Sequence, residues 1–351
     1  MNPRTARTAL AVATVAVLAS ACSLSSGSGG DAQQTPEVTL VTHNSFVAPQ
    51  DVLDAFQRRA GIKLKVVKYG DAGELTNKLV LTKANPIGDV AYGVDSTFAS
   101  RALGEGVFQP YTSPEADRGS QRYAVDPEHR LSAVDLGDVC VNVDSGYFAG
   151  KSLPEPKTYD DLADPKYKDL TVAEDPATAS PGLAFLLGTI AKFGEQGWQG
   201  YWTKLKANGL KVDSGWEEAY TKDFSGSSGK GPRPIVVSYA SSPAAEVGDD
   251  GKPRTKALLD TCYRQVEYAG VLTGSKQAPE AQKVVDFLLS QQFQTTVAAN
   301  MYVYPARQGV DLPAGWAQVA PLPTSPATLP ADQVQAGREK WIGAWRSLMG
   351  A

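Results

Sequence analysis

Short apolar runs alternate with amphipathic stretches along the first third of the chain. Residues 38–41, 62–67 and 89–95 have the continuous or alternating apolar character of β-strands. Residues 51–56 and 74–83 repeat their apolar positions at helical spacing. Strands that alternate with helices are typical of a mainly parallel, doubly wound sheet, so we expect an α/β protein.

The same alternation continues to the C-terminus, with Gly- and Ser-rich loops at 224–234 and 248–254. Ser180 and Pro181 together are a typical helix start, with Ser at the cap and Pro in the first turn. We expect strands at 135–143, 170–173, 210–212, 234–239 and 263–272, and helices at 180–191, 198–207, 278–290 and 331–348.

Two aromatic residues stand at positions where α/β sheets present ligands. A Ser-Gly turn delivers Trp216 to the start of a short helix, and an apolar strand ends in Tyr239 before a hydroxyl-rich turn. Ligands bind where strand ends open onto helix N-termini. No His or Cys stands beside them, which favours a stacking site over a reaction centre. The alternative is that both are ordinary core aromatics.

The N-terminus has the pattern of an export signal. Two arginines precede an apolar run at 9–19, which is too short to span a bilayer. The run ends in Leu-Ala-Ser-Ala-Cys at 18–22, which resembles the lipobox of bacterial lipoproteins. This resemblance implies that Cys22 is acylated after residues 1–21 are removed, which anchors the protein outside the cytoplasm. The alternative is a secreted protein with an unrelated Cys.

Composition narrows the classes of function. A chain of 351 residues is long enough for two lobes with separate cores. Removal of the leader takes away two arginines and no acid, so the net charge moves from −4 to −6, which argues against nucleic acid and gives a weak attraction for cations. Apart from Cys22, the chain has only Cys140 and Cys262, and in an exported chain these two are expected to form a disulfide. With His43 and His129 as the only histidines, no zinc site is expected.

Several short motifs, in order and spacing, resemble the thiamine-binding periplasmic proteins of ABC importers, within the larger ferric-binding and polyamine-binding class of receptors. The matching stretches are 41–46, 93–95, 174–176, 180–183, 215–220, 238–239, 242–243, 265–267 and 304–305. The chain departs from the family where His43 and Ala245 replace Tyr and Tyr302 replaces Trp. It departs again at 135–138, where Asp-Leu-Gly-Asp replaces Asp-Tyr-Gly-Tyr.

The resemblance implies a periplasmic binding protein of type II, with two α/β lobes of doubly wound mixed sheets joined by hinge strands. After the tether at 22–37, residues 38–138 with 268–310 would form one lobe, and 139–267 with 311–351 the other. The disulfide would lie at the hinge and limit the separation of its strands. The residues expected to bind the ligand in the cleft are His43, Asp95, Ser180, Trp216, Tyr239 and Tyr302.

Thiamine suits such a cleft because it joins a thiazolium cation to a flat aminopyrimidine. We expect Trp216 and Tyr239 to sandwich the cation, and Asp95 to balance its charge. A phosphate on the ligand would find Ser180 and the amides of its helix start. Each residue also has a structural alternative. Asp95 and Ser180 would be helix caps, His43 a loop residue, Tyr302 a core residue on the strand face of Tyr304, and Trp341 and Trp345 packing residues.

We therefore expect a monomeric lipoprotein that captures thiamine or a thiamine phosphate and passes it to a membrane permease with its ATPase. No cofactor, metal or catalytic residue is expected. A ferric-ion or polyamine receptor is the alternative, although Ala240 after Tyr239 removes the adjacent Tyr pair of the iron binders. A hydrolase of thiamine phosphates is a further alternative, without a Gly-x-Ser-x-Gly motif in its favour.

Overall fold

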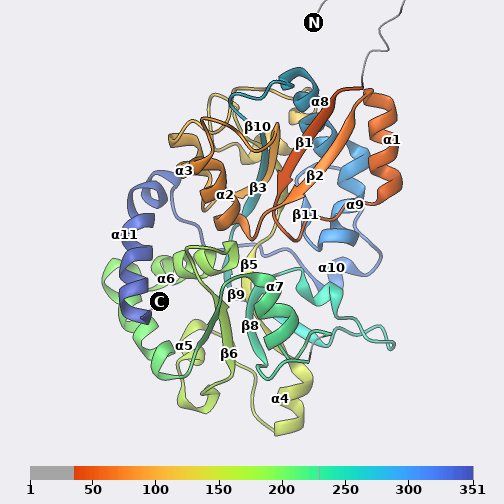
Figure 1. Cartoon of the computed structure of the whole chain (residues 1–351). Coiled ribbons are helices and arrows are strands. Elements are labelled where there is room, and N and C mark those ends of the chain that lie inside the picture. Colours follow the sequence, from red (N-terminus) through yellow and green to blue (C-terminus); the bar gives the residue numbers. More distant parts are fainter. Residues whose placement is uncertain (1–34, 229, 351) are drawn as a thin grey trace, which may run out of the picture. The chain divides into compact units, whose positions relative to one another are not determined.

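Two mixed β-sheets organise the protein in the computed structural model, which describes residues 35–228 and 230–350 (Figure 1). The first sheet has the order β11-β4-β10-β3-β1-β2, with strands β1 (Glu37–Thr42), β2 (Lys63–Lys68), β3 (Val90–Asp95), β4 (Ser132–Leu136), β10 (Val266–Val271) and β11 (Tyr304–Pro305). The second has the order β7-β6-β8-β5-β9, with strands β5 (Val139–Asp144), β6 (Thr171–Glu174), β7 (Lys211–Asp213), β8 (Ile235–Tyr239) and β9 (Thr255–Tyr263). The predicted α/β class is confirmed.

Helices cover the faces of both sheets, as expected for strands that are buried on both sides. The α-helices are α1 (Gln50–Ala60), α2 (Ala72–Leu81), α3 (Ala99–Gly104), α4 (Ser145–Lys151), α5 (Tyr159–Leu162), α6 (Ser180–Ala207), α7 (Trp216–Glu218), α8 (Ala278–Leu289), α9 (Gln291–Met301), α10 (Trp316–Val319) and α11 (Ala331–Met349). Short turns of other helix types are η1 (Ala116–Arg118), η2 (Ser120–Tyr123), η3 (Pro165–Tyr167), η4 (Ala219–Asp223) and η5 (Ser242–Ala245).

Parallel strands lie together in both sheets. In the first sheet, β1 pairs in parallel with β2 and β3, and in the second sheet β6 pairs in parallel with β7 and β8. Because parallel strands end at one edge, the loops that follow them cluster there. The loops after β1 and β2 carry His43 and Asp71, and those after β7 and β8 carry Trp216 and Ser242.

Two predicted strands are each divided between the sheets. The expected strand at 135–143 is β4 of the first sheet followed by β5 of the second, and β9 passes to β10 in the opposite direction within 263–272. The two crossings touch, because the amide of Gly137 donates to the carbonyl of Gln265 at 3.2 Å. A Cβ on Gly137 would lie 2.9 Å from the ring of Tyr239, so this crossing requires glycine. Periodicity cannot show a change of sheet, because the strand character continues across it.

The expected helices at 180–191 and 198–207 both lie within α6, where Gly194, with a non-helical φ of 71° and ψ of 171°, separates them. The C-terminal helix α11 packs against it, and Trp202 meets Trp345 edge to face with ring centroids 5.6 Å apart. Trp341 and Trp345 are 1% and 0% exposed, so their interpretation as packing residues is confirmed. The expected leader, Cys22 and most of the tether lie outside the described residues. Along the part of the chain that is described, no helix has the length and apolar character that a membrane span requires.

Cys140 and Cys262 form the predicted disulfide. It links β5 to β9, which are already neighbours in the second sheet, two to three residues from the two crossings. Both sulfur atoms are buried with Ala240. The bond therefore closes a long loop in the unfolded chain and secures the strands of one sheet at the point where they leave it.

Loss of this disulfide should lower the free energy of unfolding by about 2–4 kcal/mol, because the unfolded chain regains the freedom of the closed loop. Urea unfolding of the oxidised protein, with and without a reductant, measures the effect. The double variant Cys140→Ser/Cys262→Ser is the control and should not respond to the reductant. Equal unfolding midpoints for the oxidised and reduced protein would contradict this expectation.

Candidate functional site

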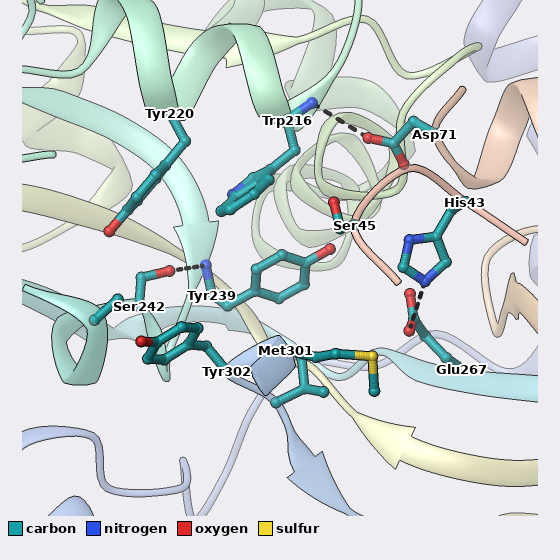
Figure 2. A pocket seen from close by; sticks show the side chains of 12 residues that line it. His43, Ser45, Asp71, Trp216, Tyr220, Tyr239, Ser242, Glu267, Met301 and Tyr302 are labelled. Carbon is teal, nitrogen blue, oxygen red and sulfur yellow. Dashed lines mark hydrogen bonds and ion pairs between the residues drawn. The ribbon is translucent and has the colours of Figure 1, made fainter. Parts of the chain in front are cut away.

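A pocket of about 650 Å³, partly open to solvent, lies where the parallel-strand ends of the two sheets face each other (Figure 2). Side chains from both sheets and their loops line it: His43, Ser45, Asp71, Trp216, Tyr220, Tyr239, Ser242, Ala245, Glu267, Met301, Tyr302 and Val303.

Three aromatic rings on the side of the second sheet form one wall. Trp216 stacks on Tyr220 with centroids 4.9 Å apart at 18°, and it meets Tyr239 at 6.2 Å and 54°. The indole N–H donates to Ser238 Oγ at 2.8 Å, which fixes the ring on β8. Tyr239 and Trp216 are each half-buried, so neither is an ordinary core residue.

The expected sandwich between Trp216 and Tyr239 does not occur in this geometry. A flat molecule between two rings needs about 3.5–4 Å on each side, more than centroids 6.2 Å apart at 54° provide. Both rings also belong to the second sheet and its loops. They therefore offer one continuous aromatic surface, against which a flat ligand would lie on one side.

Tyr302 faces this wall from the end of α9, at the end of the pocket where Tyr220 and Ser242 also lie (Figure 2). It ends that helix in the left-handed conformation, with φ at 53°, so it does not share a strand face with Tyr304 as the core interpretation supposed. Trp316 stacks on its ring with centroids 6.0 Å apart at 15°. At 39% exposure Tyr302 is not a core residue.

His43 and Glu267 lie at the opposite end of the pocket (Figure 2), with His43 Nε2 3.5 Å from a carboxylate oxygen. Burial by itself lowers the pKa of His43, but the charge and hydrogen bonding of Glu267, together with the charge of Asp71, outweigh burial and raise the pKa above 6.5. Burial likewise opposes ionisation of Glu267, yet His43 and the hydroxyl of Tyr92, which donates to it at 3.1 Å, hold its pKa below the ordinary value. Burial and the charge of Glu267 raise the pKa of Asp135 well above its ordinary value. Of these two acids, Glu267 therefore ionises more readily, and it is the one that lines the pocket.

Asp71 joins the two sides of the pocket. Its carboxylate follows β2 and accepts the amide N–H of Ala72 at 2.7 Å, at the start of α2. It also accepts the amides of Trp216 and Ser180, each at 3.2 Å, from loops and helices on the second sheet. Burial raises the pKa of Asp71, and these three donors, together with His43, offset part of that shift.

Close backbone contact accompanies these bonds. The amide of Glu74 in α2 donates to the carbonyl of Thr178 at 3.2 Å. A Cβ on Gly73 would lie 2.7 Å from the carbonyl group of Thr178. Only glycine allows α2 to approach the loop before α6 this closely.

Asp95 and Ser180 lie beside the pocket rather than among the residues that line it. They contact each other, because the Ser180 hydroxyl donates to the Asp95 carboxylate. Ser180 therefore does not cap its own helix, whose N-cap is Ala179. Asp95 also accepts the amide of Thr97 at 2.6 Å, which stabilises a turn before α3 rather than capping that helix. Burial raises the pKa of Asp95 to about 6.

Residues 85–324 match the family described as bacterial extracellular solute-binding protein. This chain belongs to that family. The thiamine-binding periplasmic protein of Salmonella typhimurium is 31% identical over 322 residues, which cover 89% of this chain and 93% of that protein. The protein of the same description from Brucella abortus is 29% identical over 326 residues, covering 90% and 92%. A solved structure titled periplasmic thiamin binding protein aligns with a TM-score of 0.79 at 28% identity, covering 90% of this chain and 97% of that one.

The sequence analysis did not predict two acidic residues that line the pocket, Asp71 and Glu267. Asp71 stands just after a predicted strand and before a predicted helix, which is the position of a ligand site at a parallel-strand end. Glu267 stood within a motif of the family resemblance, yet only its tertiary pairing with His43 marks it as a pocket residue.

The His43–Glu267 pair can be tested by NMR, because the chain has only two histidines. The His43 ring should titrate with a midpoint above 6.5, since the charge of Glu267 favours its protonated form. A raised pKa in the folded state adds stability that is complete below the unfolded pKa and is lost as pH rises through the folded value. Relative to His43→Gln, the wild type should therefore lose stability as the pH rises above about 6.5 and through the folded-state pKa of His43. The variant His129→Gln assigns the signals, and a His43 midpoint below 6.5 would contradict the pairing.

Proposed function

We propose that this solute-binding protein captures thiamine. The observation that carries the proposal is the pairing of an aromatic wall with two carboxylates, Asp71 and Glu267, in a pocket whose described lining includes no Lys or Arg. A flat organic cation matches such a site, because aromatic faces attract cations by about 0.5–2 kcal/mol and carboxylates balance their charge. Thiamine has this chemistry, and it is named in the descriptions of the relatives above.

The two ends of the pocket suit the two rings of thiamine. The thiazolium would lie against Trp216 and Tyr239, with Asp71 at the edge of that wall. Glu267 would accept a hydrogen bond from the amino group of the pyrimidine, and His43 would hold that carboxylate in place. Tyr302, steadied by Trp316, would cover the ligand from the side of α9.

Transport follows from the family. In this proposal Cys22 carries a lipid anchor, residues 22–37 tether a monomer outside the cytoplasm, and the loaded protein delivers thiamine to an ABC permease with its ATPase. The protein acts by binding, without a catalytic step. The division into lobes at 38–138 with 268–310 and at 139–267 with 311–351 is the part of this proposal that would let the protein open and close.

The site favours an organic cation over ferric ion. Within residues 35–228 and 230–350, no group of three or more His, Cys, Asp or Glu is placed to hold a metal ion. The pocket presents aromatic faces instead, together with Met301 and Val303. A long polyamine has no flat ring to stack on the wall of Trp216 and Tyr220.

Removal of the indole should weaken thiamine binding selectively. Trp216→Ala should cost about 1–3 kcal/mol of binding free energy, the range of a binding hot spot. Isothermal titration calorimetry measures it, with choline as the control ligand and Trp216→Phe as the variant that keeps an aromatic face. If wild-type protein binds thiamine no more tightly than choline, the proposed function is wrong.

Closure around the ligand can be tested at Gly73. Gly73→Ala should weaken thiamine binding by about 1–3 kcal/mol, because the added methyl group forces α2 away from Thr178. Alanine favours the helix itself, so the variant should fold. Gly343→Ala in α11 is a matched control, since a Cβ there meets nothing within 4 Å. Equal affinities of the Gly73→Ala and Gly343→Ala proteins would mean that this contact is not needed for binding.

A further inference from the structure

We propose that one edge of the first sheet rests on an anionic lipid surface through a cluster of basic side chains. This basic edge consists of Arg58, Arg59, Lys63, Lys65 and Lys283, all of them exposed. The inference rests on the proposed function in one respect, the lipid anchor at Cys22, which would hold the chain beside a membrane.

The basic side chains come from elements that meet at one place. Between Asp54 and Asp71 the sequence has five basic residues and no acidic one. Four of the five, at positions 58, 59, 63 and 65, lie in the last turn of α1 and the first half of β2. The helix α8 packs beside α1 (Figure 1), where Lys283 donates to the carbonyl of Ala60 at 3.4 Å.

Few acids offset this positive charge. Glu37 pairs with Lys63 at 2.7 Å, and Glu280 stands in the first turn of α8. Five basic side chains less these two acidic ones leave three net positive charges at the basic edge, in a chain whose total charge is −4. Among the described residues, the ion pairs do not include Arg58, Arg59 or Lys65. These three charges are therefore available to an external anion.

The basic edge lies where the parallel strands begin. Glu37 and Lys63 are partners at the start of β1 and β2, and the amide of Lys63 donates to the carbonyl of Pro36 at 2.8 Å. The pocket lies at the other edge of the sheet, where His43 and Asp71 follow the ends of these strands. A surface bound at the basic edge therefore leaves the pocket uncovered.

One exposed apolar side chain lies on the same side of the sheet. Leu81 is 81% exposed, more than any other large apolar side chain that the structure describes. It is near the end of the return from β2 to the start of β3, because it is the last residue of α2. Leucine near lysine and arginine is the combination that suits the headgroup region of a bilayer.

The position of the chain start names the surface that this edge would meet. Residues 22–34 are the 13 residues that would separate the lipid from Thr35, and a chain of that length spans at most about 45 Å. Thr35 and Pro36 lead directly into the basic edge. Anionic lipids attract clustered Lys and Arg within a Debye length of about 10 Å at 0.1 M salt. With so few charges the contact is reversible, so the protein can leave it to deliver its ligand.

Acetylation of lysines on vesicles tests the inference residue by residue. From Thr35 onward the chain forms one compact unit, so the chain from residue 22 can be used. Cys22 is its one free thiol, because Cys140 and Cys262 form the disulfide, and it can be coupled to a maleimide lipid. The vesicles contain phosphatidylcholine alone or with an equal part of phosphatidylglycerol, at the same protein density.

We expect Lys65 and Lys283 to be acetylated about fivefold more slowly on the vesicles with phosphatidylglycerol, as measured by mass spectrometry. The difference should vanish at 1 M salt, where the Debye length is about 3 Å. The exposed lysines of the second sheet's surroundings, Lys168, Lys192 and Lys204, should react equally on both vesicles. Equal rates for Lys65 and Lys283 on both vesicles, or equal slowing of all five lysines, would overturn the inference.

A pair of charge variants assigns the effect to the basic edge. Arg58→Gln/Arg59→Gln keeps the lysines that report the contact and should reduce their slowing to less than about twofold. Lys192→Gln/Lys204→Gln removes the same charge from α6 and should retain the full slowing. Full slowing in the arginine variant, or an equal loss in both variants, would overturn the inference.

Thiamine titration of the same proteins separates this inference from the proposed function. Both variants should bind thiamine as the wild type does, because neither pair of residues lines the pocket. The coupling to lipid is chemical and acetylation needs no thiamine. Absence of thiamine binding would therefore reject the proposed function, while the acetylation rates alone decide whether the basic edge contacts the lipid.

Discussion

The carboxylate of Asp71 is the interaction on which the arrangement of the pocket depends. One side chain receives amide N–H groups from α2, from the start of α7 and from the start of α6. Those three elements come from the loops of two different sheets. Hydrogen bonds to an ionised acceptor are about twice as strong as neutral ones, so an ionised Asp71 positions the aromatic wall and joins the two sides at once. Gly73, two residues after Asp71, lets the backbone of α2 approach that of Thr178 as closely as these bonds require.

Buried acids elsewhere around the pocket are stabilised in different ways. His43 and Tyr92 hold the pKa of Glu267 below its ordinary value, whereas burial and the charge of Glu267 raise the pKa of Asp135 behind it. Glu174, at the end of β6, is fully buried, and burial followed by the charges of Asp71 and Asp213 raises its pKa well above the ordinary value. A neutral Glu174 avoids like-charge repulsion with Asp71. The negative charge that remains faces the ligand space, which is why the site suits a cation.

Much of the fold was predictable because its signals are local. The strands β1, β2, β3 and β6 and the helices α1, α2, α8 and α11 follow periodicity and cap residues that the sequence shows directly. The two crossings between sheets were not predictable in this way. The sequence of β4 and β5 has the pattern of one continuous strand, and so does the sequence that contains the end of β9 and all of β10. Only Gly137 marked the first crossing in the sequence. The reason that glycine is required there is the close approach of Tyr239, which is a tertiary contact.

The site was predictable for residues that follow strand ends. It was less predictable for residues whose place in the pocket depends on contacts with side chains distant in the sequence. Trp216, Tyr239, His43 and Tyr302 line the pocket, as their positions and the family resemblance indicated. Asp95 and Ser180 lie beside it, because each satisfies the hydrogen bond of the other. The carboxylates that line the pocket are Asp71 and Glu267 rather than Asp95, and their contacts join residues far apart in the sequence. No pattern along the chain could have shown that the rings of Trp216 and Tyr239 are too close for a sandwich.

A crystal structure of the protein grown with thiamine tests the central claim most directly. The account predicts density for the thiazolium on one side of the Trp216–Tyr239 wall, density for the pyrimidine near Glu267, and a retained bond from the Trp216 amide to Asp71. Density for thiamine outside this pocket, or Asp71 turned away from Trp216 with the ligand bound, would contradict it.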